Sequence, residues 1–176
     1  MKTHDVLNQP PPIPDVDLFT ADPVLPSAVA REGGAWASDD IAAFARTVGT
    51  PEWFEQGHLA NTFTPQLRSH DRYGNRIDEV EFHPSWHRLM EMSVNHGIHS
   101  LPFERPAGEG GRVVRDALFM VMSQVEAGHG CPISMTTSCV PAMRAELGFG
   151  LQVMVLAALS QQDAPSLDHY LRVRPS

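Results

Sequence analysis

The apolar stretch at residues 112–127 leaves this chain few possible folds. Its apolar residues fall on more than one side of a helix and comprise Val113, Val114, Ala117, Leu118, Met120, Val121, Met122 and Val125. A helix of this kind is buried on most of its faces. We therefore expect a core helix over residues 112–127, and the loop before it contains prolines and a glycine cluster.

Signals for helix starts and ends recur at short intervals along the rest of the chain. Ser38 is a good N-cap, the acidic residues 39–40 complement the helix dipole, and Gly49 can end that helix. Pro51 and Pro84 open two further helices near the first helical position, where the missing N–H costs nothing. The expected helices cover about residues 28–32, 38–48, 50–61, 84–96, 112–127 and 131–147, and an apolar segment follows at residues 151–159.

Strand patterns are almost absent. Residues 72–76 have turn chemistry, and Val80 and Phe82 alternate with polar residues in a short extended segment before Pro84. About six helices with almost no strand pattern predict an all-α fold, a helical bundle. We expect residues 72–90 to fix the path between two helices rather than to contact a substrate.

Residues 1–26 are expected to form an extended arm before a helical domain at residues 27–176. Prolines at positions 10, 11, 12, 14, 23 and 26 disfavour regular structure there and favour a polyproline-like path. The apolar residues of the arm are too many for a free linker: Val6, Leu7, Ile13, Val16, Leu18 and Phe19. We expect the arm to lie along a surface, its own or a neighbouring subunit's, and a disordered tail is the alternative.

Charge and composition exclude several classes of protein. The formal net charge is −8, from 21 acidic and 13 basic residues, which disfavours DNA binding because phosphate neutralisation supplies most non-specific affinity. No apolar run approaches the length of a membrane helix, and the N-terminus lacks the apolar region of a secretory signal. Cys131 and Cys139 lie on one expected helix, where a mutual disulfide is disfavoured, so we expect a cytoplasmic protein.

The chain has nine histidines, and histidine is a common ligand of zinc. His83 and His87 are four residues apart, as two zinc ligands on one helix face would be. His83 precedes Pro84, however, and therefore stands at the helix boundary rather than on the face. Capping and surface roles explain these residues better than zinc does.

Two further stretches have a chemical and a simpler interpretation, namely residues 129–131 and the glycine-rich loop. Cys131 lies near a helix N-terminus, which lowers the pKa of a thiol, and His129 is close in sequence. Sequence neighbours do not make a catalytic dyad, so a small packed cysteine is the simpler interpretation. The glycine-rich loop at residues 108–111 precedes a helix but follows no strand, which favours a plain loop over a phosphate site.

The helix around residues 131–147 carries small polar residues among strong hydrophobes, and Pro141 is expected to bend it. Close helix packing is one explanation for them. The other is a slot for an extended apolar ligand, with Ile133, Ser134 and Thr137 pointing into one groove.

Three tracts in the same order resemble the adaptive-response, AidB-type acyl-CoA dehydrogenases. They are GHLANTFTPQL at residues 57–67, RYGNRIDEVEFHPSWH at residues 72–87 and QVEAGHGCPISMT at residues 124–136. NQPPP at residues 8–12 and AREGGAW at residues 30–36 fit the same family. The resemblance covers nearly the whole chain and weakens after about residue 146.

The resemblance implies the N-terminal α-helical domain of an enzyme that also has a β-domain and a C-terminal α-domain. Such enzymes are homotetramers with FAD that act on acyl-CoA-like substrates. Most of the family's flavin tracts, its catalytic glutamate and its basic DNA-binding region lie beyond the part that this chain matches. The resemblance therefore implies no catalytic residue here and no flavin bound by this chain alone. It does imply that Ile133, Ser134 and Thr137 line the acyl pocket.

Two hypotheses of different classes follow. The chain is either the N-terminal domain, or a truncated form, of an FAD-dependent acyl-CoA dehydrogenase-like oxidoreductase of the DNA-alkylation-response type, or a stand-alone, non-catalytic helical interaction module. In the first case it contributes one wall of the acyl pocket and part of an oligomer interface.

Overall fold

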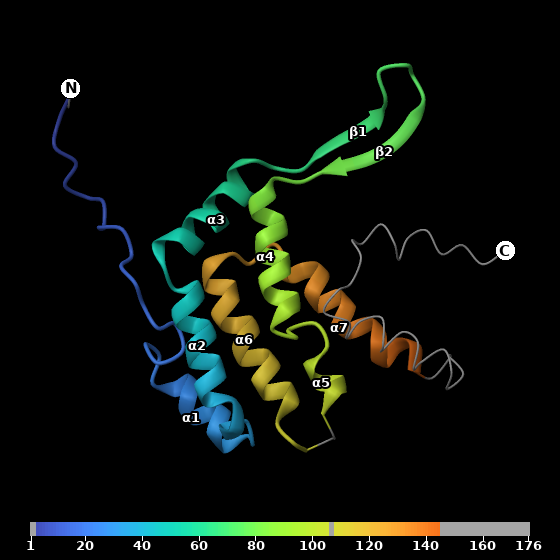
Figure 1. Cartoon of the computed structure of the whole chain (residues 1–176). Helices are drawn as coiled ribbons and strands as arrows, with labels where there is room; N and C mark the ends of the chain where they lie inside the picture. Colours follow the sequence, from blue (N-terminus) through green and yellow to red (C-terminus); the bar gives the residue numbers. More distant parts are fainter. Residues whose placement is uncertain (1–2, 106–107, 145–176) are drawn as a thin grey trace.

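The computed structural model describes residues 3–105 and 108–144 and is mostly helical. Figure 1 shows a helical body from which a two-stranded hairpin and the N-terminal arm extend. The helices are α1 (Val24–Arg31), the short 3-10 helix η1 (Ala35–Ala37), α2 (Ser38–Val48), α3 (Pro51–Thr62), α4 (Pro84–Asn95), α5 (Leu101–Glu104), α6 (Gly111–Val125) and α7 (Gly130–Arg144). The strands are β1 (Gln66–His70) and β2 (Arg76–Glu81). The predicted bundle is confirmed, and the expected apolar segment at residues 151–159 lies outside the described residues.

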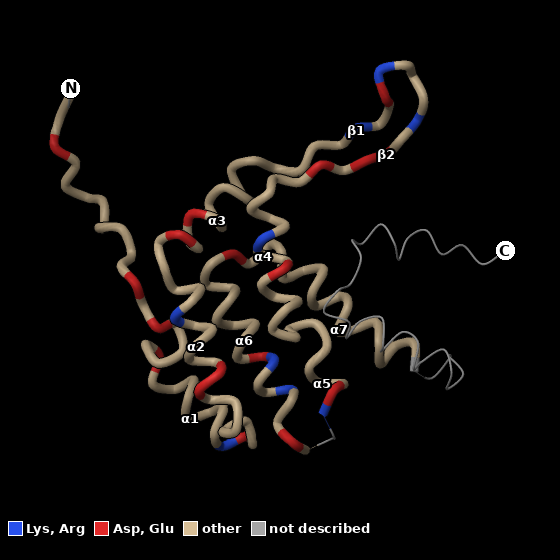
Figure 2. The backbone as a smooth tube through the Cα atoms, in the orientation of Figure 1, with Lys and Arg blue, Asp and Glu red and all other residues tan. Residues whose placement is uncertain are grey.

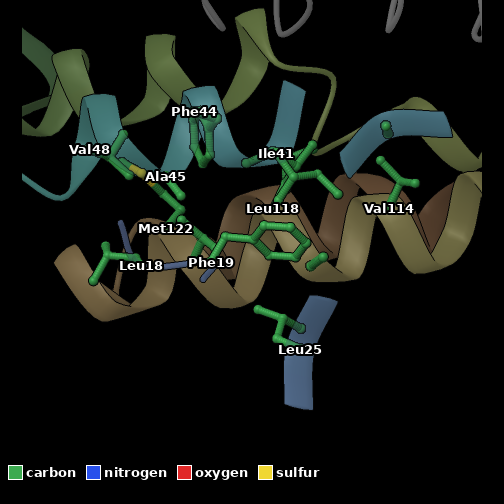
Figure 3. Packing of buried hydrophobic residues seen from close by; sticks show 14 of the residues in the cluster. Leu18, Phe19, Leu25, Ile41, Phe44, Ala45, Val48, Val114, Leu118 and Met122 are labelled. Atoms are coloured by element: carbon green, nitrogen blue, oxygen red, sulfur yellow. The ribbon is translucent and has the colours of Figure 1, made fainter. Parts of the chain in front are cut away.

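Helix α6 is the core helix that the apolar stretch predicts. Five of its apolar residues belong to the hydrophobic core, namely Val114, Ala117, Leu118, Val121 and Met122. Figure 3 shows Leu118 and Met122 packed with α2 and with Phe19 of the arm. The α2 stripe of Ile41 and Phe44 is buried against α6, and each such side chain contributes about 1.5–3 kcal/mol on burial.

The end of the arm is anchored to the helical body. Leu18 and Phe19 are buried in the core, and the Val16 N–H donates to the carbonyl oxygen of Gly49 over 2.9 Å. A Cβ at position 49 would overlap the Val16 carbonyl oxygen, so this approach requires glycine. Val6, Leu7 and Ile13, which come earlier in the described part of the arm, are exposed, whereas its final part packs against its own chain.

The start predicted from the sequence was wrong for α1, and so was the N-cap predicted for α2. Helix α1 begins at Val24 and includes Pro26, because a proline in the first turn loses no intrahelical hydrogen bond. Ser38 is not the N-cap of α2: Ala37 holds that position, and the Ser38 N–H donates to the Ala35 carbonyl oxygen. The preceding η1 runs directly into α2, so Ser38 is already helical.

Strand β1 and its pairing with β2, between α3 and α4, were not predicted from the sequence, and neither was the short helix α5, which lies where a loop was expected. Strand β1 pairs antiparallel with β2, with Leu67 opposite Val80 and Arg68 opposite Glu79. The register shifts after Arg68, where Asp78 has a φ of 49°. Asp71 holds the turn by accepting the backbone N–H groups of residues 73 and 75 on one carboxylate oxygen. Every residue of both strands is exposed.

Candidate functional site

The connection between α6 and α7 contains a buried polar network. Glu126 follows the last residue of α6, and its Oε2 accepts hydrogen bonds from the backbone N–H of His129 over 2.7 Å and from His129 Nδ1 over 2.9 Å. The other ring nitrogen, Nε2, lies 2.9 Å from Oγ of Ser93 on α4. Glu126 Oε1 accepts the Gly128 N–H over 2.6 Å and Nδ2 of Asn61 over 3.2 Å. The network therefore ties α3 and α4 to the α6–α7 turn.

The side chains of Glu126, His129 and Ser93 are sealed from solvent. The exposed fractions are 7% for Glu126, 2% for His129 and 1% for Ser93. Burial raises the pKa of Glu126, but the hydrogen bonds from His129, Gly128 and Asn61 outweigh burial and hold that pKa below its ordinary value. Glu126 is thus ionised at neutral pH, and its acceptor capacity fixes the His129 ring with the proton on Nδ1.

Glu126, His129 and Ser93 are connected in the same order as the acid, the base and the nucleophile in the catalytic triad of a serine hydrolase. A catalytic triad needs a space beside the serine hydroxyl for the carbonyl group of the substrate. None of the three residues lines the described cavity, and all three are buried. The arrangement therefore acts as a structural tie, because no substrate can reach Ser93.

A separate cavity of about 460 Å³ lies between α2, the α4–α5 connection and α6. Its walls are mostly apolar, with Ile41, Phe44 and Leu118 among them, and its charged lining residues are the carboxylates Asp40 and Glu104. Flavin adenine dinucleotide carries a pyrophosphate, which requires cationic or N–H donors. The cavity does not fit that cofactor, because its carboxylates would repel the phosphates.

Helix α7 holds the three predicted pocket residues. Ile133 belongs to the hydrophobic core, whereas Ser134 and Thr137 are half-buried. Thr137 Oγ1 donates to the His99 carbonyl oxygen at 2.9 Å and lies 3.1 Å from the Ile133 carbonyl oxygen. None of the three lines the described cavity. The side chain of Ile133 thus packs within the domain, and those of Ser134 and Thr137 lie partly at its surface.

The histidines of the α3–α4 region have the capping and surface roles expected of them. His83 is the N-cap residue of α4, and its Nδ1 accepts the Ser85 N–H over 3.2 Å. His96 is the C-cap residue, and its Nδ1 lies 2.9 Å from the Met92 carbonyl oxygen. Across residues 3–105 and 108–144, no group of three or more His, Cys, Asp or Glu residues could hold a metal ion.

Cys131 has no basic partner in His129, because both ring nitrogens of that histidine are engaged by Glu126 and Ser93. Cys131 is exposed and Cys139 half-buried, and both are free.

The glycine-rich loop at residues 108–111 packs closely against the start of the chain's helical part. A Cβ at Gly110 would overlap the Gly33 carbonyl oxygen, and Trp36 Nε1 donates to the Glu109 carbonyl oxygen over 2.9 Å. These contacts agree with a plain loop at residues 108–111, whereas the expectation that Cys131 is a packed residue is wrong, because its side chain is exposed.

Sequence reasoning missed the Glu126–His129–Ser93 network. Glu126 and His129 stand three residues apart in the tract at 124–136, so a local pair could have been considered. Ser93 is 36 positions from His129, and no sequence spacing brings it there. The partner on α4 was therefore visible only in the folded chain.

The fold is that of the N-terminal helical region of acyl-CoA dehydrogenases. It matches the crystal structure of Caenorhabditis elegans ACDH-11 in complex with C11-CoA with a TM-score of 0.70 and 20% identity, covering 93% of this chain and 29% of that one. It also matches the apo form of Bd2924 with a TM-score of 0.75 and 23% identity, covering 90% of this chain and 32% of that one.

The chain belongs to the family of the adaptive response protein AidB N-terminal domain, whose model matches residues 8–168. It is 44% identical over 142 residues to "Putative acyl-CoA dehydrogenase AidB" of Escherichia coli (strain K12), covering 81% of this chain and 26% of that protein. It is 25% identical over 105 residues to acyl-CoA dehydrogenase family member 11 of Caenorhabditis elegans, covering 59% of this chain and 17% of that protein. The chain thus spans about a quarter or less of the length of these relatives.

Proposed function

We propose that this chain serves as the N-terminal helical part of an FAD-dependent acyl-CoA dehydrogenase-like oxidoreductase of the DNA-alkylation-response type. The observation that carries the proposal is the family match over residues 8–168. In this role the chain supplies one wall of the acyl pocket and part of an oligomer interface. Its buried network is a structural tie, so the proposal assigns it no catalytic residue.

The acyl-pocket wall is helix α7. Ile133, Ser134 and Thr137 are the residues proposed to border the acyl chain, and the half-burial of Ser134 and Thr137 supports this. A relative of the same fold, ACDH-11, was crystallised with C11-CoA, which supports an acyl-CoA substrate for the complete enzyme. Small residues at such positions leave room for a long apolar chain.

FAD belongs to the complete enzyme in this proposal. The acidic lining of the described cavity argues against a flavin site within this chain alone. The free cysteines support a cytoplasmic location, and the net charge of −8 argues against DNA as a partner of this chain. Within the described residues, no helix is both long and apolar enough to cross a membrane.

A chimera tests the proposal. The matching N-terminal part of the Escherichia coli relative is replaced by this chain, and flavin content and oxidation of acyl-CoA substrates are measured. We expect flavin to bind, and we expect Ser134→Phe to shift the preference towards shorter acyl chains, because the larger side chain fills the pocket. Ser138→Phe, at an exposed position of the same helix, is the matched control. An equal effect of both variants on all acyl lengths would reject the pocket wall.

Whether this chain alone binds FAD can be tested directly by mixing the purified chain with the cofactor. After excess cofactor is removed, the visible spectrum should show no stoichiometric flavin band. A stoichiometric band would contradict the assignment of the flavin site to the rest of the enzyme.

A stand-alone interaction module is the second candidate, and the continuous buried core within the described residues favours it. A chain with its own core can fold without further domains. Cooperative thermal unfolding of a monodisperse sample would support the module, whereas aggregation would support a part with an uncovered interface.

A further inference from the structure

The hairpin has one apolar and one charged face. Leu67 and Val80 are opposite each other, with exposed fractions of 68% and 51%. Arg68 and Glu79 form the next pair, and successive residues of a strand point to opposite sides. Arg68 also forms an ion pair with Glu81. The apolar side is therefore open to solvent, and the opposite side carries the ion pair of Arg68 with Glu81.

Aromatic residues lie at the base of the hairpin, next to the helical body. Phe82 stacks on Trp86 at a ring-centroid distance of 4.1 Å, and Phe63 stacks on His83 at 4.9 Å. Phe63 is exposed, and the other three rings are half-buried. We call Leu67, Val80, Phe82 and Trp86 the hairpin face. A two-stranded ribbon is at best marginally stable alone, so an exposed face of this kind indicates a binding surface.

The arm has the complementary features. Residues 3–15 include Val6, Leu7 and Ile13, all exposed, and Leu7 retains 94% of its surface. They also include prolines 10–12 and 14, which favour an extended polyproline path. Proline-rich segments of this type bind to surfaces lined by aromatic side chains, because little conformational entropy is lost.

The charges of the arm and of the hairpin turn also favour a contact between the two segments. The arm residues 3–15 carry Asp5 and Asp15 and no Lys or Arg, and Figure 2 shows only acidic colour along them. Arg72, at the hairpin turn, lies over the Tyr73 ring at 5.2 Å. In the described part of the chain it pairs with no carboxylate. Asp15 of the arm can supply that carboxylate.

We propose that the hairpin face of one copy of this chain binds the proline-rich arm of a second copy. Figure 1 shows the arm and the hairpin leaving the helical body on different sides, so each apolar segment is directed away from its own partner surface. An extended arm of this length reaches roughly 40 Å at about 3.1 Å per residue. That reach exceeds the roughly 20 Å length of a six-residue strand pair. The contact rests on the oligomer interface in the proposed function and specifies its location.

Self-association of the full chain tests the proposal by sedimentation velocity over a concentration series. Leu7→Asp and Val80→Asp should each weaken self-association at least about tenfold, because an apolar contact is replaced by a desolvated charge. Val24→Asp is the matched control, since Val24 is a valine with 69% of its surface exposed on α1. Leu7→Asp changes an exposed residue outside the helices and strands, so its effect cannot come from unfolding.

Photo-cross-linking identifies the chain that supplies the arm. A photo-reactive amino acid replaces Leu7 in a mixture of ¹⁴N-labelled and ¹⁵N-labelled chains, equilibrated at low concentration and then concentrated. We expect arm–hairpin cross-links with mixed isotopes. Same-isotope pairs alone would mean that the arm binds its own hairpin, and cross-links elsewhere would mean another surface; either result overturns the proposal.

The outcomes also separate this contact from the wider proposal. Self-association that neither Leu7→Asp nor Val80→Asp weakens overturns the arm–hairpin contact and leaves an oligomer interface elsewhere intact. A chain that stays monomeric throughout the series contradicts both. In either case the pocket wall on α7 is judged separately by the chimera.

Discussion

His129 donates its Nδ1 hydrogen to Glu126 Oε2 over 2.9 Å, and both side chains are buried. The same oxygen accepts the backbone N–H of His129 over 2.7 Å. One carboxylate thus fixes both the turn between α6 and α7 and the orientation of the ring. Through Nε2 the ring then contacts Ser93 on α4 over 2.9 Å, so a local pair within a turn becomes a link between helices.

Glu126→Ala should lower the free energy of unfolding by at least about 2 kcal/mol, because several buried donors lose their acceptor. Glu126→Gln keeps the shape and part of the acceptor capacity and should cost less. Urea denaturation at neutral pH measures both. Glu55→Ala, at an exposed position of α3, is the control and should change stability by less than about 0.5 kcal/mol. Equal losses for Glu126→Ala and Glu55→Ala would refute the role of the network.

The same carboxylate predicts a pH dependence. The pKa of Glu126 in the folded chain is below its ordinary value of 4.5, so the unfolded chain binds this proton more tightly. The stability from Glu126 is then fully present above about pH 4.5 and is lost as the pH falls through the lower, folded-state pKa. The difference in urea midpoint between the wild-type chain and Glu126→Gln should therefore shrink on acidification. A difference that grows towards acid pH would reverse the assigned sign.

Gly49→Ala should cost at least about 2 kcal/mol, because the new methyl group would overlap the Val16 carbonyl oxygen. The substitution also strains the hydrogen bond from Val16 to Gly49 that anchors the arm. Gly74→Ala is the comparison: its methyl group meets open space, and the φ of 86° alone costs about 1 kcal/mol. Thermal unfolding of the two variants checks the order, which is wrong if Gly74→Ala is the less stable protein.

Thr137→Val should destabilise the chain by about 1 kcal/mol, because its hydroxyl links α7 to the His99 carbonyl oxygen over 2.9 Å. Thr136→Val is a control with the same change at the next position, where the hydroxyl bonds only the Pro132 carbonyl oxygen within α7. That variant should stay within about 0.5 kcal/mol of the wild-type chain. Equal unfolding midpoints for both variants would mean that the link to His99 contributes nothing.

The helices were predictable where local signals and apolar spacing agree. Pro51 and Pro84 begin α3 and α4, and the stretch from residue 112 becomes α6, within one or two residues of the expected bounds. β1 was not predictable, because Gln66, Arg68 and His70 are polar and form a strand only through pairing with β2. Pairing between segments carries no local signal when neither face is buried.

In the candidate site, too, some features followed from local signals in the sequence and others did not. Ile133 was singled out from small and apolar residues on one helix, and the fold puts it in the core; its role at the acyl pocket stays a prediction. The capping role of His83 followed from the Pro84 beside it. The link from His129 to Ser93 joins residues 36 positions apart, and no spacing rule reaches across that interval.

The sequence by itself determined the helical class, the family and the proline-rich nature of the arm, because helix propensity, capping and residue order are local properties. Only the tertiary structure decided which groups are buried together. It sealed Glu126, His129 and Ser93 beneath the helices, and it left Leu67 and Val80 of the hairpin open to solvent. Burial depends on how distant segments pack, and the chemistry available to a carboxylate or a hydrophobic face changes with it.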